Sequence, residues 1–209
     1  MQKKRFTADE TTILNNLISK ASRHAISGIA EMVKREVEVE TVNPKQIQIS
    51  KIKTLLKDPD SNVIGIELGI TGDADGTMLL MYPPEVALGL ADLLMDKSVG
   101  ETQSLEEMGE SALGEMGNIA GGFFLNSLAD DTHMRLLPTP PTVTVDTAKS
   151  LLDQAMKPIS KTQNASIFVL ETVFKAQGHE ISGNFMVLSS PSLLDTLVKR
   201  SMNISQATN

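Results

Sequence analysis

The segment "GTMLLMYPPEVALGLADLLMDK" (76–97) decides the fold, because its plan returns later as "GNFMVLSSPSLLDTLVKR" (183–200). Each segment has a glycine, an apolar run typical of a strand, a turn that contains proline, and an amphipathic helix. Gly76 matches Gly183 and Pro84 matches Pro191, with a separation of 107 residues in both cases. The chain therefore looks like one structural unit written twice.

A predicted β-hairpin stands before each of these two segments. "NVIGIELGITGDADG" (62–76) leads into the first, and "ASIFVLETVFKAQGHEISG" (165–183) leads into the second. Both combine strand-forming residues with Gly or Asp at the tip. Hairpins joined to helices indicate an α+β domain, in which helices pack on an antiparallel or mixed sheet.

The upstream parts of the two units also correspond. "NNLISKASRHAISGIAEMVKREVEVETVNP" (15–44) and "SALGEMGNIAGGFFLNSLADDTHMRLLPTP" (111–140) align without a gap at a separation of 96 residues, and each predicts a long helix followed by a short strand. The change in separation from 96 to 107 places eleven extra residues in the second copy, around 146–163. Thr102 or Ser104 is predicted to cap the second long helix.

We therefore expect a single domain over residues 1–209 with pseudo-twofold symmetry. It consists of one pseudo-repeat over 8–100 and a second over 104–200, joined by the short segment "DKSVGETQS" (96–104). The junction is short, so the two halves are expected to share one core.

Composition excludes several classes of function. The chain of 209 residues has no cysteine, so disulfides, thiolate catalysis and Cys-ligated zinc are excluded. Its net charge of −7, without a basic stripe and with 3% aromatic residues, makes nucleic acid a poor partner. The sequence has neither a secretory signal pattern nor an apolar run near the roughly 20 residues of a membrane span, so we expect a cytoplasmic protein.

One stretch of the second long helix, "SALGEMGNIAGGFF" (111–124), is unusual because it holds four glycines. Each glycine inside a helix costs roughly 0.5–1 kcal/mol relative to alanine. On a helix, four positions fall within an arc of about 60°, and the apolar residues lie on the other side. These four are Ser111, Glu115, Asn118 and Gly122.

Two interpretations of this helix remain open from spacing alone. The acid and the amide, with bare backbone at Gly121 and Gly122, suit insertion into the pocket of another molecule. Alternatively, the polar residues form an ordinary solvated face, and the glycines allow close packing against the helix at 15–34. At a separation of 96, Ser19 and Ser22 stand where the second copy has Glu115 and Asn118.

The pattern Ser111, Glu115, Asn118 and Pro141 resembles the signature of the CheC-type phosphatases of chemotaxis, the CheC/CheX/FliY family. The resemblance is strongest in the segments "SALGEMGNIAGG" and "VTVD". The duplicated order of predicted helices and strands also fits this family over roughly residues 8–200. The first repeat departs from the pattern, because it has serines at the two reactive positions. The resemblance thus predicts one working site, in the second repeat.

The resemblance implies hydrolysis of the aspartyl phosphate of the response regulator CheY. In such proteins the active helix lies on the phosphorylation site of CheY. Carried over, Glu115 pairs with a lysine of the receiver and Asn118 orients the attacking water, while Ser111, Gly122 and Pro141 contact the partner. The Mg²⁺ ion belongs to CheY, so the resemblance implies no cofactor in this chain.

A second class of function stays open, a non-catalytic interaction module of the chemotaxis or flagellar switch system. CheC-type proteins also bind the receptor deamidase CheD, and the extra segment 146–156 is a candidate surface for it.

Other sequence patterns give no further indication of a functional site. "DPDSN" (58–62) begins like a calcium loop but has Val63 where glycine is needed, and the three histidines lack metal-site spacing.

Overall fold

The computed structural model describes residues 6–33, 37–40, 45–48, 51–52, 56, 58–157, 166–176 and 179–207. In this part of the chain one eight-stranded sheet has the order β1-β7-β8-β4-β3-β5, while β2 also pairs with β7 and β6 with β3. Every pairing is antiparallel. The strands are β1 Val37–Glu40, β2 Lys45–Gln48, β3 Asn62–Gly72, β4 Gly76–Tyr82, β5 Leu136–Pro138, β6 Thr142–Thr147, β7 Ser166–Ala176 and β8 His179–Ser189.

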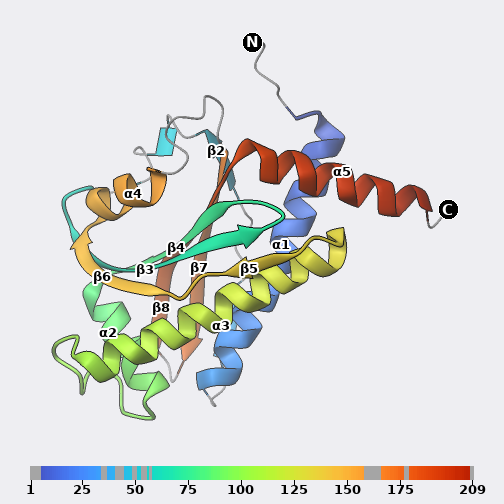
Figure 1. The fold of residues 1–209 in the computed structure, drawn as a ribbon. Helices are drawn as coiled ribbons and strands as arrows, with labels where there is room; N and C mark the ends of the chain where they lie inside the picture. Colours follow the sequence, from blue (N-terminus) through green and yellow to red (C-terminus); the bar gives the residue numbers. More distant parts are fainter. Residues whose placement is uncertain are drawn as a thin grey trace.

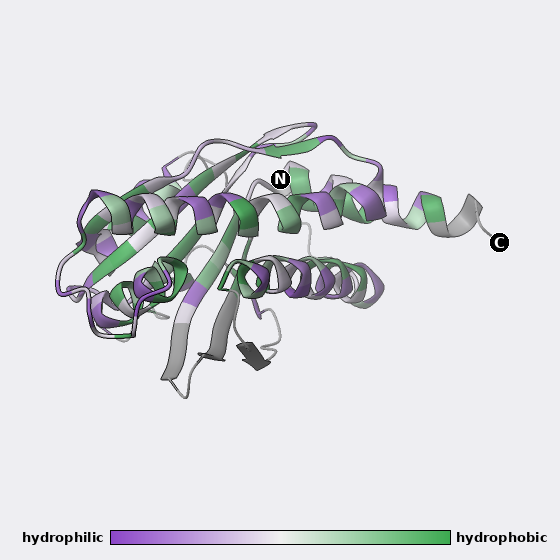
Figure 2. Cartoon of the chain, turned by 90° about the horizontal axis from the view of Figure 1, so that it is seen from below, coloured by the Kyte–Doolittle hydropathy of each residue, from purple (hydrophilic) through white to green (hydrophobic). Residues whose placement is uncertain are grey.

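Helices lie on both faces of this sheet (Figure 1). One face packs against four helices in the larger hydrophobic core. The smaller core, on the opposite face, joins α4 to residues such as Val63, Leu79 and Met81. The helices are α1 Ala8–Val33, α2 Pro84–Leu94, α3 Glu107–Thr132, α4 Ala148–Met156 and α5 Pro191–Ala207. Hydrophilic and hydrophobic residues are both visible along them, as amphipathic helices require (Figure 2).

The predicted α+β class and both hairpins are confirmed. β3 pairs with β4, and β7 pairs with β8, as the two hairpin segments predicted. α2 and α5 begin at Pro84 and Pro191, the two prolines that the sequence matched. Proline is favoured in the first turn of a helix, since its missing N–H would have no partner there.

The order of the strands fits the expected duplication. β1 and β2 both pair with β7, as β5 and β6 both pair with β3. Pairing of β4 with β8 then joins the two hairpins into one continuous sheet. α4 belongs to the extra segment of the second half, and it forms the short helix that covers Gly65 through the side chain of Leu151.

The two long helices correspond in a different register from the one the sequence suggested. Their bounds, Ala8–Val33 and Glu107–Thr132, differ by 99 residues at both ends. At this separation every buried residue of α1 falls on a buried residue of α3. At the expected separation of 96, buried Ser22 would fall on exposed Asn118. The register of 96 is therefore wrong.

A shift of three residues turns a helix by only about 60°, so the apolar pattern of the sequence barely distinguishes the two registers. In the observed register Asn16 and Ser19 stand at the positions of Glu115 and Asn118. Ser22 corresponds instead to Gly121; it is buried, and its hydroxyl donates to the carbonyl of Ile18 at 2.6 Å. Within the first repeat, Ser22 is thus a packing residue.

α1 and α3 contact each other directly. A methyl group added at Gly28 would lie 3.0 Å from the ring of Phe123 and 3.2 Å from Ile119, so the glycine permits this approach. Lys20 Nζ of α1 also lies 2.6 Å from Asp131 Oδ1 of α3. The ion pair is partly exposed, and such pairs contribute little, so the apolar contact holds the helices together.

Two glycines of α3 allow the helix to lie close to the sheet. A methyl group at Gly117 would lie 2.5 Å from Cγ2 of Ile66, and one at Gly121 would lie 3.0 Å from Cε of Met78. Gly122 has nothing within 4 Å of the same position. The expectation that Gly121 is open to a partner is therefore wrong, because it faces the sheet, whereas Gly122 is open as expected.

We predict opposite effects of two alanine substitutions in this helix. Gly117→Ala should lower the free energy of unfolding by about 1–3 kcal/mol, because the new methyl group overlaps the side chain of Ile66. Gly122→Ala should raise it by about 0.5–1 kcal/mol, because it adds helix propensity without a clash. Urea unfolding of both variants and the wild type measures the difference; equal effects of the two would contradict this account.

The segment before α3 is held by a buried carboxylate of α2. Asp92 Oδ2 accepts from the Gly100 N–H at 2.9 Å, and Oδ1 accepts from the Thr102 N–H at 3.1 Å and from its hydroxyl. Thr102 is thus not a helix cap. The N-cap of α3 is Glu106, whose side chain makes no capping hydrogen bond, so the expected cap at Thr102 or Ser104 is wrong.

This carboxylate makes the stability of the fold depend on pH. Burial raises the pKa of Asp92, but the hydrogen bonds from Thr102, Gly100 and Glu101 outweigh it and hold the pKa below its ordinary value of 3.8. A lowered folded-state pKa gives stability that is present above the unfolded value and is lost as pH falls through the folded value.

We expect Asp92→Asn to be less stable than the wild type by about 1–3 kcal/mol at pH 7, since hydrogen bonds to a charged acceptor are lost. The difference should begin to narrow as the pH falls below 3.8, where the unfolded carboxylate takes up its proton, and it should shrink further until the folded carboxylate is protonated at a lower pH. Urea unfolding at neutral and acidic pH measures both values. A difference that is constant across this range would show that the charge of Asp92 is not what holds the junction.

Candidate functional site

A groove of about 510 Å³ lies between the N-terminal half of α3 and the beginning of β6. β5 and β6 run alongside α3, so one side of the groove is helix and the other is the edge of the sheet (Figure 1). Eight described residues line it: Glu107, Glu110, Ser111, Gly114, Glu115, Pro141, Thr142 and Val143.

Glu115 and Asn118 lie on adjacent turns of α3 and are both exposed. The opposite side of the helix is buried, including Leu113, Met116 and Phe124. Within the part of the chain that the structure describes, no hydrogen bond or ion pair engages the side chain of Glu115 or Asn118. Both groups are therefore available to another molecule.

The other predicted site residues divide between the groove and the ridge of α3. Ser111 and Pro141 line the groove together with Glu115, although Pro141 is far from them in sequence. Asn118 and Gly122 lie farther along α3 and are not among the lining residues. The structure thus brings Ser111, Glu115 and Pro141 together, and it places Asn118 one turn beyond them.

Gly114 joins the site for a reason that the sequence did not reveal. A methyl group at this position would lie 3.7 Å from Cγ2 of Val143 and 3.8 Å from Cγ of Pro141, which is ordinary contact. The glycine therefore forms the floor of the groove without being required by packing. Spacing within the helix gave no signal for it, because the opposing residues come from β6.

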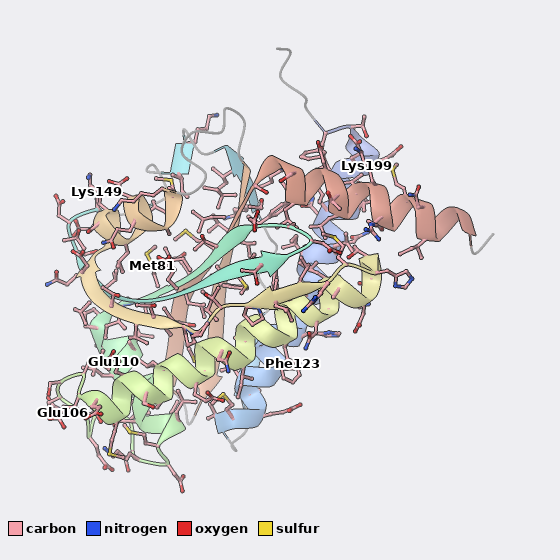
Figure 3. The ribbon with its side chains drawn as sticks, in the orientation of Figure 1. Met81, Glu106, Glu110, Phe123, Lys149 and Lys199 are labelled. Carbon is pink, nitrogen blue, oxygen red and sulfur yellow. The ribbon has the colours of Figure 1, made fainter. Side chains whose placement is uncertain are left out.

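The groove is acidic on the helix side and partly apolar on the other. Glu107, Glu110 and Glu115 contribute carboxylates, and none of the described residues that line it is basic. Figure 3 labels Glu110 and the neighbouring Glu106 at the N-terminal end of α3, with Phe123 farther along near α1. Glu107 was not singled out from the sequence, because its place in the groove depends on the opposing residues 141–143. A cationic group of a partner would be favoured here.

A further carboxylate near the groove belongs to the other face of the sheet. Glu67 pairs across strands with Thr142, and burial raises its pKa. Side chains alternate along a strand, and the neighbouring Ile66 faces α3, so Glu67 points away from the groove. It is not part of the site.

Neither a metal site nor a membrane span is found among the described residues. No group of three or more His, Cys, Asp or Glu side chains there is arranged to hold an ion. Likewise, none of the helices described is both long and apolar enough to pass through a lipid bilayer.

The comparison with protein families confirms the resemblance to the CheC-like family. The model of that family matches residues 108–145, which include Ser111, Glu115, Asn118, Gly122 and Pro141. The same segment forms most of α3, β5 and the groove side of β6. Over this segment, which holds α3 and the groove, the chain is similar to the CheC-like family.

Among individual proteins, the chain is similar to the CheY-P phosphatase CheC of Bacillus subtilis (strain 168). The two are 26% identical over 178 residues, which cover 82% of this chain and 83% of that protein. The similarity thus extends well beyond the segment that the family model matches.

Solved structures share the fold. FliY of Thermotoga maritima superposes with a TM-score of 0.76 at 19% identity, covering 96% of this chain and 99% of that one. A chain of the CheX–CheY–BeF₃–Mg²⁺ complex of Borrelia burgdorferi gives 0.55 at 20% identity, covering 84% and 99%. The middle domain of FliM from Helicobacter pylori gives 0.63 at 12% identity, covering 93% and 99%.

Proposed function

We propose that this chain dephosphorylates the phosphorylated response regulator CheY. One observation carries the proposal: Glu115 and Asn118 are exposed on adjacent turns of α3 and make no side-chain hydrogen bond or ion pair to any described residue, inside the segment that matches the CheC-like family. The similarity to a protein named CheY-P phosphatase supports the choice of substrate.

Glu115 is the anchor in this proposal. Its carboxylate lies in an acidic groove, where a lysine side chain of the receiver would form an ion pair with it. Ser111, Gly122 and Pro141 contact the receiver around this pair. The open backbone at Gly122, with nothing within 4 Å, leaves space for the receiver beside the helix.

Asn118 positions the attacking water. A carboxamide has an oxygen that accepts a hydrogen bond and an NH₂ group that donates two, so it can orient a water and contact a phosphoryl oxygen together. Phosphoryl transfer needs little covalent participation by the protein, and positioning with charge neutralisation suffices. The Mg²⁺ and the phosphorylated aspartate belong to the receiver.

The first repeat is proposed to be structural, so that each chain has one working site. In the observed register Asn16 and Ser19 occupy the reactive positions of α1. Asn16 has no charge with which to anchor a lysine, and Ser19 is too short to reach as Asn118 does.

The proposal is tested by replacing Asn118 with alanine. Asn118→Ala should raise the barrier to phosphate release from phosphorylated CheY by about 2–4 kcal/mol, because the water loses its orientation. The rate should therefore fall on the order of 30- to 1,000-fold. Single-turnover dephosphorylation with Mg²⁺ measures the rate. Asn126→Ala, at an exposed position two turns along the same helix, is the matched control and should act within about twofold of the wild type.

Wild-type activity in Asn118→Ala would refute the assignment of the water-positioning role. A wild-type chain that binds phosphorylated CheY or CheD but releases no phosphate would instead support the second candidate, a non-catalytic interaction module. The fold similarity to FliM does not decide between them, because at 12% identity it concerns architecture alone.

Replacement of Glu115 should affect binding more than chemistry. Glu115→Gln keeps the shape but removes the charge, so we expect KM for phosphorylated CheY to rise about tenfold while kcat changes little. The dependence of KM on ionic strength should also weaken, because one ion pair is gone. Steady-state kinetics at two salt concentrations measure both effects; a pure loss of kcat would assign Glu115 to the chemical step instead.

A further inference from the structure

β5 and β6 pair with the same side of β3, but their registers differ by one residue. Pro138 of β5 lies opposite Ile70, whereas Thr142 of β6 lies opposite Glu67. Three residues, 139–141, therefore span the two residues Leu68 and Gly69 of β3. An extra residue opposite a continuous strand is a β-bulge, a feature that bends the strand and redirects its side chains.

The side chain of Thr139 closes this bulge. The Thr139 N–H donates to the Gly69 carbonyl at 2.9 Å, and the Gly69 N–H donates to Thr139 Oγ1 at 2.8 Å. The hydroxyl also donates to the carbonyl of Pro140 at 3.3 Å. Because Pro140 and Pro141 have no N–H, they cannot continue the ladder. A side-chain oxygen thus takes the place of the backbone acceptor that regular pairing would supply.

Gly69 completes the arrangement. A methyl group at this position would lie 2.9 Å from Cγ2 and 3.2 Å from Oγ1 of Thr139, so the threonine side chain occupies the space of the missing side chain. The threonine is held by the hydrogen bonds on one side and by this close contact on the other. Its position fixes where the chain leaves β5.

The bulge determines where the sheet side of the groove stands. Pro141 follows Thr139 by two residues, and its ring lies 3.8 Å from the place of a methyl group at Gly114. Pro141 and Val143 therefore contact α3 at the floor of the groove, beside Ser111 and Glu115. A displacement of the bulge would move this wall while leaving α3 in place.

We infer that Thr139 is a positioning residue for the docking groove: its hydroxyl, by accepting from the Gly69 N–H, closes the β5–β6 bulge and sets the Pro141 wall opposite Glu115. This inference rests on the proposed function, since it assigns Thr139 to the recognition of the receiver. Asn118 lies on α3, so the chemical step is independent of Thr139.

Thr139→Val tests the inference, because it removes the hydroxyl and keeps the shape. We expect KM for phosphorylated CheY to rise roughly three- to tenfold, the range for loss of one ordinary hydrogen bond, with kcat within about twofold of the wild type. The Gly69 amide should also exchange its hydrogen faster. Thr139→Ser, which keeps the hydroxyl, should restore both KM and exchange.

Two further variants keep the test decisive. Thr71→Val is the matched control: Thr71 Oγ1 donates to the Leu137 carbonyl at 3.2 Å on the same pair of strands but outside the bulge, so its loss should leave KM unchanged. If Thr139→Val does not fold, Thr139→Ser against Thr139→Ala isolates the hydroxyl, since the two differ only in that group.

Any of three results would overturn the inference. These are an unchanged KM in Thr139→Val, an unchanged exchange rate of the Gly69 amide in that variant, and a Thr139→Ser variant with the same defects as Thr139→Val. Absence of phosphate release by the wild type would instead refute the proposed function. Because the exchange of the Gly69 amide is measured without CheY, the two failures are distinguishable.

Discussion

The approach of α3 to β3 is the constraint on which the rest of the structure depends. Gly117 brings the helix backbone against Ile66, with no room for even a methyl group between them. Because the helix is rotationally fixed by this contact, the residues on its far side must face solvent. The position of Glu115 and Asn118 is therefore a consequence of packing at the opposite surface of the same helix. Glycine lowers the stability of a helix interior relative to alanine, and the close approach to the sheet explains why Gly117 and Gly121 are nevertheless present.

Much of the architecture follows from local sequence patterns. The two hairpins, the two helices that begin at Pro84 and Pro191, and the exposed arc of α3 are all decided by residues near one another in the chain, and alternation or helical period is enough to find them. The same holds for Ser111, Glu115 and Asn118, which share one helix. Pro141 could be placed beside them only through a family resemblance, because its position depends on the sheet.

The parts that escaped prediction depend on contacts between distant segments. The register of the two long helices differs by three residues from the expected one. The two registers differ by a helix rotation of only about 60°, so the apolar pattern fits both, and only the observed burial of each residue distinguishes them. Thr102 was a plausible cap by residue type, but its hydroxyl instead donates a hydrogen bond to the buried carboxylate of Asp92. The bulge at Thr139 and the groove floor at Gly114 arise where β3, β6 and α3 meet, which no single stretch of sequence encodes.

The contact between Gly28 and Phe123 makes the second half of the chain depend on the first. The first half supplies the surface against which the ring of Phe123 in α3 packs, so the position of α3 depends on that half. Its exposed positions, such as Asn16, by contrast lie outside these core contacts. Substitutions in the interior of the first half should therefore disturb α3, whereas substitutions on its exposed face should leave α3 in place.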